Sequence, residues 1–388
     1  MEQPAIPCAR GGARPGACPG GGASVTDEIS AERSPSAGAL TSRIRRRDIL
    51  RGGVGLGVTG AFIASAGCLS PTVGPGAARV APVGLGAVHT AHGPPGATGI
   101  LMGVPPDAPE SAWAPANPAE ILTAFDEGRV TLLPTGQTLR EYRVEAQAAE
   151  VEIAKGVTYP AWTYNGTVPG TTLRCTEGDR LKVYFVNGGA HPHTIHFHGI
   201  HPANMDGVFE QVPPGGSYVY EFDAEPFGLF PYHCHIMPTK KHIEKGLYGT
   251  LIIDPPTPRP PARELVMVMN GFDTDVDGKN EFYTVNGVAN YFLEHPIQLR
   301  VGELVRAYVV NMTEFDPVNS FHLHGNMFKL FRTGTSLTNH EITDTVMLCQ
   351  GERVVLEFSF KYPGKYMFHA HQSEFSELGW MGIFEVQA

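Results

Sequence analysis

The strongest constraint on the fold of this chain is an internal repeat. Four segments recur in the same order in a second copy: YNGTVPG (164–170) with TVNGVAN (284–290), EGDRLKVYFVN (177–187) with VGELVRAYVVN (301–311), HFHG (196–199) with HLHG (322–325), and YHCH (232–235) with FHAH (368–371). The segments are short runs rich in β-branched and aromatic residues, broken by turns, and helical periodicity is nearly absent. The sequence therefore predicts an all-β protein with two tandem sandwiches.

Composition suggests four regions. We predict a disordered export segment over 1–68, a Pro/Gly-rich linker over 69–137, a first β-domain over 138–256 and a second over 262–388. The proline cluster DPPTPRPPAR at 254–263 separates the two repeats.

The N-terminal region resembles a twin-arginine export signal. Arg46 and Arg47 precede the apolar run 53–67, which is too short to span a membrane. We therefore expect export to the periplasm, the cell surface or the medium. Cys68 ends a degenerate lipoprotein box, so a lipid anchor at this residue stays open.

Charge and cysteine content exclude other classes. The net charge is −10, and the first 68 residues carry eight basic and five acidic side chains, or +3, which leaves −13 on the rest. Such an acidic remainder argues against nucleic acid as a partner. The six cysteines lie far apart, which is not the spacing of a disulfide scaffold or a zinc finger.

Histidines are concentrated in the repeated segments. Of the 16 histidines, eight form four His-X-His pairs, two in each repeat. Side chains alternate between the faces of a strand, so each pair directs two imidazoles to one face. Eight imidazoles suit a cluster of two or three metals better than a single ion. The predicted ligands are His196, His198, His233, His235, His322, His324, His369 and His371.

A second metal site is predicted on the opposite face. Cys234 lies between His233 and His235, and His193 has the opposite parity to His196. The side chains of Cys234 and His193 are therefore expected to point away from the histidine cluster. His242 can return after a loop as a third ligand. Two histidines and a thiolate form the blue-copper electron-transfer set. Leu247 stands at the weak axial position, with Met237 as the alternative axial donor.

Over about 138–388 these motifs resemble the multicopper oxidases, and particularly the subgroup with two cupredoxin-like Greek-key domains. The resemblance implies four copper ions per protomer: one type 1 ion at His193, Cys234 and His242, one type 2 ion at His196 and His322, and two type 3 ions at His198, His233, His235, His324, His369 and His371. Asn319 and Ala370 replace His193 and Cys234 in the second repeat, so the type 1 copper belongs to the first repeat alone.

The resemblance also implies a reaction. Single electrons from a small reducing substrate enter at the type 1 copper, and the cluster reduces dioxygen to water. Asp206, in NMDG after HFHG, resembles the family's acidic residue near the type 2 copper, although a turn-forming role is the alternative. Glu374, three residues after His371, is a second proton-relay candidate, with Glu377 as a substitute.

Two other functions stay open at this point. Copper nitrite reductases share the two domains and the type 1 loop, but they place an aspartate where His196 stands. A copper protein that only carries electrons would leave the second set of histidines unexplained. The default donor is a phenol, an aromatic amine or a metal ion. The subgroup further implies a homotrimer with clusters at its subunit interfaces, and a monomer whose two domains close on each other is the alternative.

Overall fold

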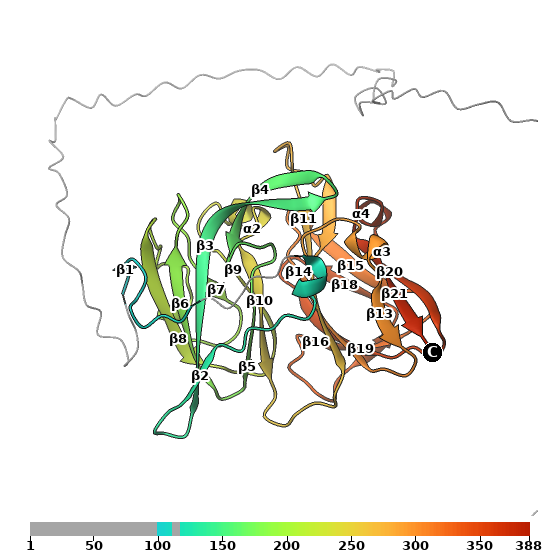
Figure 1. Cartoon of the computed structure of the whole chain (residues 1–388), viewed down its shortest axis with the longest axis horizontal. Helices are drawn as coiled ribbons and strands as arrows, with labels where there is room; N and C mark the ends of the chain where they lie inside the picture. Colours follow the sequence, from blue (N-terminus) through green and yellow to red (C-terminus); the bar gives the residue numbers. More distant parts are fainter. Residues whose placement is uncertain (1–98, 111–116) are drawn as a thin grey trace, which may run out of the picture. The chain divides into compact units, whose positions relative to one another are not determined.

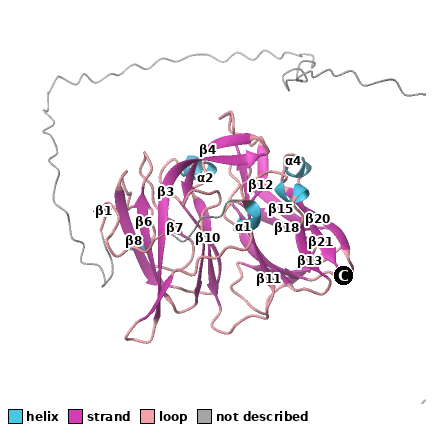
Figure 2. Ribbon diagram, viewed as in Figure 1, coloured by secondary structure: helices cyan, strands magenta, loops and turns pink. Residues whose placement is uncertain are grey.

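The computed structural model describes residues 99–110 and 117–388, and their regular secondary structure is mostly β-strand (Figures 1 and 2). The predicted all-β fold is confirmed. The twin-arginine segment, Cys68 and the greater part of the predicted linker lie outside the described residues. Within the described ranges, no helix has the length and apolar character needed to cross a membrane.

The first repeat folds into two sheets. The larger sheet has the order β1 (Leu101–Met102), β8 (Gly216–Asp223), β6 (Arg180–Asn187), β3 (Thr138–Ala154), β2 (Arg129–Leu132), with β4 (Val157–Tyr164) also paired to β3. The smaller sheet has the order β5 (Thr172–Thr176), β10 (Tyr248–Asp254), β9 (Gly228–His233), β7 (His196–Phe197).

The second repeat also folds into two sheets. One has the order β12 (Phe282–Val285), β11 (Arg263–Phe272), β14 (Val305–Asn311), β19 (Arg353–Phe358), β16 (Phe328–Arg332), β17 (Glu341–Thr343). The other has the order β13 (Ile297–Arg300), β21 (Met381–Gln387), β20 (Gly364–His369), β15 (Val318–Leu323), β18 (Thr345–Cys349).

The two repeats share strand pairings that place their histidines alike. Parallel pairs β3–β6 and β5–β10 of the first repeat correspond to β11–β14 and β13–β21 of the second. Antiparallel pairing sets His196 opposite His233 on β7 and β9, and His322 opposite His369 on β15 and β20. Directly opposed residues of adjacent strands have close Cβ atoms, so each pairing brings two His-X-His motifs together.

Buried apolar side chains form three clusters. One fills the first sandwich and includes Phe197 and Tyr232, and another fills the second and includes Phe321 and Trp380. The third joins the two sandwiches and contains Tyr159, Leu229, Val266, Tyr308 and Val355. Because this third cluster removes apolar surface of both repeats from water, it holds them together in one chain.

The predicted linker ends earlier than its assigned boundary at residue 137. Residues 117–137 contain α1 (Pro118–Ile121) and β2, and β2 pairs with β3. Asn117 caps α1 by accepting hydrogen bonds from the backbone N–H groups of Ala119 and Glu120. The assignment of 117–137 to a linker is therefore wrong. Its Pro/Gly content suggested a linker, but these residues form a short capped helix, α1, and an edge strand, β2.

Candidate metal centres

The first centre lies where β9 meets the loop that contains α2 (Thr239–Glu244). Cys234 directly follows β9, His242 belongs to α2, and His193 precedes β7. The sulfur of Cys234 lies 3.2 Å from Nδ1 of His242 and 3.8 Å from Nδ1 of His193, and the two nitrogens are 3.2 Å apart. All three residues are buried. Three convergent donors of this kind fit one copper ion in a trigonal N₂S set.

Burial prepares these side chains for a metal. Together with the smaller effect of neighbouring cationic groups such as His191, it lowers the pKa of His193 to about 3 and that of His242 to about 4. Both rings are therefore neutral at pH 7, the form that binds metals. Burial raises the pKa of the Cys234 thiol, and a bound cation opposes this effect because coordination favours the thiolate.

The axial region is apolar. Leu247 is fully buried, its carbonyl accepts the backbone N–H of Cys234 at 3.0 Å, and its own N–H donates to the carbonyl of His242 at 3.1 Å. Met237, in contrast, is 77% exposed and its sulfur accepts the Thr239 hydroxyl at 3.4 Å. The alternative of Met237 as the axial donor is therefore wrong, because its thioether lies in solvent.

The histidines of the first repeat form one set. Ligand atoms of His196, His198 and His233 lie within 4.8 Å of one another, and the ring of His235 is 5.3 Å from that of His196. Nδ1 of His196 donates to the Asp206 carbonyl at 2.8 Å, and Nδ1 of His233 donates to the Cys234 carbonyl at 3.0 Å. Hydrogen bonds at Nδ1 leave Nε2 free for a metal and fix the orientation of the ring.

The second repeat forms an equivalent set. Ligand atoms of His322, His324 and His369 lie within 4.8 Å, and the ring of His371 is 5.3 Å from that of His322. Nδ1 of His369 donates to the carbonyl of Ala370 at 2.6 Å, as His233 does to Cys234. His324 and His371 are exposed, so this half of the predicted cluster is open to solvent in the single chain.

The two histidine sets do not meet within the chain. Among these eight histidines, all of which the structure describes, ring contacts join only members of the same repeat. The second repeat instead approaches His198 through Gly351, where a Cβ would lie 3.8 Å from Cε1 of His198. Within one chain these eight histidines thus form two separate sets.

The predicted acidic residues differ in their placement. A carboxylate oxygen of Asp206 lies 3.2 Å from Nδ1 of His196 and 3.7 Å from Nε2 of His201. Asp206 is thus brought next to a predicted type 2 ligand. Glu374 lies exposed in the first turn of α4 (Ser373–Glu377), and its role stays a prediction.

Several neighbours of the histidines were not predicted. Nδ1 of His322 lies 3.0 Å from the carbonyl of Asp344 and 2.8 Å from the hydroxyl of Thr345. Asp344 thus corresponds to Asp206, and the repeated Asp-X-Val at 206–208 and 344–346 is the signal that could have revealed it. Trp162 packs against the rings of His193 and His242 at centroid distances of 5.5 and 5.0 Å, and no repeat signalled it.

The second repeat lacks the donors of a type 1 centre, because Asn319 and Ala370 stand in the places of His193 and Cys234. The Ala370 N–H donates to the carbonyl of Trp380 at 3.1 Å, as Cys234 does to Leu247. Trp380 thus takes the place that Leu247 has in the first repeat, and its indole is fully buried in the core of the second sandwich. Asn319, in the place of His193, is also fully buried, and its amide donates to Thr313 at 3.2 Å.

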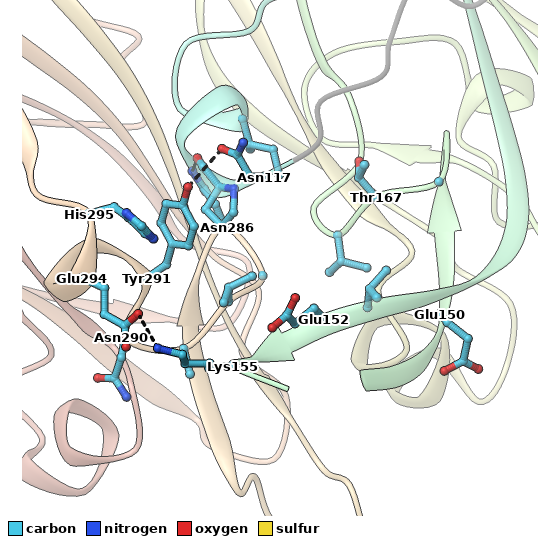
Figure 3. Close-up of a pocket in the computed structure, with 18 residues that line it drawn as sticks. Asn117, Glu150, Glu152, Lys155, Thr167, Asn286, Asn290, Tyr291, Glu294 and His295 are labelled. Carbon is cyan, nitrogen blue, oxygen red and sulfur yellow. Dashed lines mark hydrogen bonds and ion pairs between the residues drawn. The ribbon is translucent and has the colours of Figure 1, made fainter. Parts of the chain in front are cut away.

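A cavity of about 640 Å³ lies away from these centres (Figure 3). It is lined by the NG turns of both repeats and by α3 (Tyr291–Glu294), and the ion pair between Lys155 and Glu294 crosses one side at 3.6 Å. None of the predicted metal ligands lines it.

Comparison with known proteins agrees with this geometry. Two models of multicopper oxidase domains match residues 145–258 and 258–388. A crystal structure described as a multicopper oxidase is 53% identical in sequence and superposes with a TM-score of 0.69. The match covers 70% of this chain and 97% of that one.

Curated relatives include other copper proteins. The copper-containing nitrite reductase of Neisseria gonorrhoeae is 30% identical over 252 residues, which is 59% of this chain and 64% of that protein. A copper resistance protein A homolog of Pseudomonas syringae pv. tomato is 34% identical over 172 residues, which is 42% of this chain and 26% of that protein. The chain thus spans less than two thirds of either relative. From the two matched domain models and the 53% identical structure, the chain belongs to the multicopper oxidase family of copper-dependent oxidoreductases.

Proposed function

We propose that this protein is a laccase-like oxidase that couples one-electron oxidation of a phenol, an aromatic amine or a metal ion to four-electron reduction of dioxygen to water. The observation that carries this proposal is the presence of two complete histidine sets beside one Cys-His-His centre. Four copper ions bound at these residues would supply one-electron redox chemistry at the type 1 centre and multi-electron chemistry at the type 2 and type 3 centre.

The chain itself provides the electron path. Cys234 is covalently joined to His233 and His235, and the His233 ring donates a hydrogen bond to the Cys234 carbonyl. One short segment therefore links the two centres both through bonds and through a hydrogen bond. The Leu247 side chain and the burial of all three type 1 ligands keep water away from the entry site.

Protons must accompany the electrons. The Asp206 carboxylate lies within 3.2 Å of Nδ1 of His196 and is partly exposed, so it can both orient this ring and exchange protons with solvent. We propose Asp206 as the residue that holds a proton near the cluster, with Glu374 as a second candidate from the other repeat.

A nitrite reductase is the second candidate, favoured by the gonococcal relative. His196 argues against this function, because copper nitrite reductases resemble this chain elsewhere but carry an aspartate at this position. His196 lies within ligand distance of His198 and His233, and its ring contacts that of His235, so it joins a set of four that a single nitrite-binding copper does not require.

We further propose that the protein is a homotrimer with a shared cluster at each subunit interface. The separation of the two histidine sets within one chain and the exposure of His324 and His371 support this arrangement. A head-to-tail contact would bring the first repeat of one subunit to the second repeat of the next, and such contacts close into a ring. Copper bound between subunits would stabilise the ring, because it binds the assembled form only.

We also propose that the protein is exported by the twin-arginine route. As an alternative to release after export, a lipid attached to Cys68 would anchor it to a membrane. Both rest on the sequence of residues 46–68 alone.

Cys234→Ser tests the function directly. The variant should lose the intense blue thiolate-to-copper absorption and oxidise phenols at no more than background rate, because the entry centre has lost its thiolate. Oxygen uptake and nitrite consumption should be measured in parallel with 2,6-dimethoxyphenol or Fe(II) as donor. Wild-type protein should consume one dioxygen per four electrons and leave nitrite untouched, whereas nitrite turnover without oxygen uptake would favour the reductase. Cys349→Ser, which changes an exposed free thiol, is the matched control.

Leu247→Met tests the axial position. A thioether in place of the buried isobutyl group should donate weakly to the copper and lower the reduction potential of the type 1 centre. The volume change is small, so the fold should tolerate it. Redox titration of the blue band measures the effect, and Met237→Leu should leave the potential unchanged. An unaltered potential in Leu247→Met would place the axial group elsewhere.

A further inference from the structure

The carboxylate of Asp206 lies between two imidazoles. One of its oxygens, Oδ1, is 3.2 Å from Nδ1 of His196 and 3.7 Å from Nε2 of His201. His196 belongs to the histidine set of the first repeat, whereas His201 is not a member of any His-X-His pair. It belongs to the loop that leaves β7 and returns to it at Asp206, so a second imidazole approaches the same carboxylate from within this loop.

The ring of His201 is held in place. Its side chain is only 9% exposed, and the ring packs against that of Phe222 at a centroid distance of 5.7 Å. Nε2 lies 2.8 Å from the carbonyl oxygen of Phe197, and Nδ1 lies 3.3 Å from that of Pro202. Because a carbonyl only accepts, Nε2 carries a hydrogen in its short contact with Phe197. The partial positive charge of this N–H therefore also faces the Asp206 carboxylate.

The second repeat holds its equivalent acid in another way. Asp344, which corresponds to Asp206, is followed by Thr345, whose hydroxyl donates to the Asp344 carboxylate at 3.0 Å. Gly207 stands in the place of Thr345 and has a φ of +71°. A Cβ at Gly207 would lie 1.8 Å from the carbonyl oxygen of Ile195, so the close approach of the loop to β7 excludes a side chain there. A side-chain donor for the first acid must therefore come from another position of the loop.

The two repeats exchange the position of this donor. Met327 occupies in HLHGNM (322–327) the place that His201 has in HFHGIH (196–201). A thioether has no hydrogen to donate. The first repeat thus has an imidazole N–H beside its acid where the second repeat has the hydroxyl of Thr345.

We propose that His201 is a positioning residue that holds the Asp206 carboxylate against His196. The proposal rests on the role of Asp206 in the oxidase function proposed above. The Asp206 side chain is 31% exposed, and Nδ1 of His196 also donates to the Asp206 carbonyl at 2.8 Å. Without the N–H of His201, the carboxylate is therefore free to turn towards solvent while the His196 ring keeps its backbone hydrogen bond.

Three substitutions of His201 separate its N–H from its packing. His201→Phe keeps a flat ring against Phe222 and removes both nitrogens. His201→Gln places an amide N–H near the position of Nε2, whereas His201→Asn places one near Nδ1, which faces Pro202 instead. In stopped-flow measurements, reoxidation of the reduced, copper-loaded protein by dioxygen should slow about tenfold in His201→Phe and His201→Asn and stay within about threefold of wild type in His201→Gln. Anaerobic reduction of the blue centre should be unchanged, because the type 1 ligands are intact.

Combination with Asp206→Asn shows whether His201 acts through Asp206. The double variant His201→Phe/Asp206→Asn should reoxidise no more than about twofold more slowly than Asp206→Asn alone, since both changes remove the same contact. Multiplication of the two effects would mean that His201 acts independently and would refute the proposal. His340→Phe changes an exposed histidine of the second repeat and should match the wild type.

Copper content distinguishes a positioning residue from a ligand. Donor atoms of His196, His201 and Asp206 lie within 4.8 Å of one another, so His201 is near enough to share an ion. A positioning role predicts the same copper content in His201→Phe as in the wild type. Loss of copper from His201→Phe would make His201 a ligand and contradict the proposal.

Crystal structures of the variants provide a readout that does not depend on turnover. In His201→Phe the Asp206 carboxylate should move beyond about 4 Å from Nδ1 of His196, and in His201→Gln it should stay in place. An unmoved carboxylate in His201→Phe would overturn the proposal. If His201→Phe does not fold, His201→Asn takes its place in this comparison. If the wild-type protein takes up no oxygen with any donor, the oxidase function fails, and the position of the carboxylate alone then decides the role of His201.

Discussion

Replacing His322 and His324 with alanine should stop dioxygen reduction and leave the blue absorption intact. Both residues belong to the histidine set of the second repeat, whereas His193, Cys234 and His242 lie in the first. Loss of a residue that only supports a metal ligand typically costs 10- to 100-fold in affinity or activity, so loss of two ligands should cost more than about 100-fold in oxygen uptake. A donor should still bleach the blue band under anaerobic conditions, because electron entry is unaffected.

Two exposed histidines of the same repeat provide the control. His295 and His340 lie outside both sets, so the double alanine variant should retain wild-type oxygen uptake. Copper content, measured by atomic absorption, should fall in His322→Ala/His324→Ala and stay constant in the control. Wild-type oxygen consumption in the first variant would mean that the cluster is not built from the second repeat.

Two inactive variants should restore activity when their subunits are combined. His196→Ala/His198→Ala lacks ligands in the first repeat, and His322→Ala/His324→Ala lacks them in the second. In a head-to-tail trimer, an interface between an intact first repeat and an intact second repeat forms only in mixed rings. Random assembly from equal amounts makes about one interface in four complete, so about a quarter of the wild-type rate should return on co-expression.

A second combination tests whether the recovery is specific. His322→Ala/His324→Ala and His369→Ala/His371→Ala both damage the second repeat, so no arrangement of their subunits yields a complete cluster. Tandem affinity tags can isolate the mixed oligomers, and oxygen uptake per copper then compares the two combinations. An active monomer in light scattering, or mixed oligomers with no recovered activity in the first combination, would contradict the shared cluster.

The strand alternation correctly predicted which side chains meet. Period-two parity placed His193 and Cys234 on one side and His196, His198 and His233 on the other, and the structure brings these groups together as expected. β7 contains only His196 and Phe197, and His193 forms an isolated bridge with Val212, yet the ligands still separate by parity. Local geometry decided this result, and local geometry is readable from a sequence.

Other features depend on contacts between distant segments. Met237 and Leu247 both follow Cys234 at plausible spacing, and only the path of the α2 loop buries one and exposes the other. The position of Trp162 beside the first centre also depends on contacts between distant segments. The backbone N–H of Trp162 in β4 donates to the carbonyl of Lys245, at the end of α2, at 2.9 Å. No periodicity encodes such an approach.

By itself the sequence determined the all-β class, the duplication and the composition of each histidine set, because repeats, strand parity and donor chemistry are local or self-similar properties. The tertiary structure decided that the two sets lie apart in one chain and that Asp206 lies beside His196. The separation of the two sets follows from how the sandwiches pack through their shared apolar cluster, which is a sum of many weak contacts between residues far apart along the chain. The placement of Asp206 follows from the loop after β7, which returns to His196 within the first sandwich.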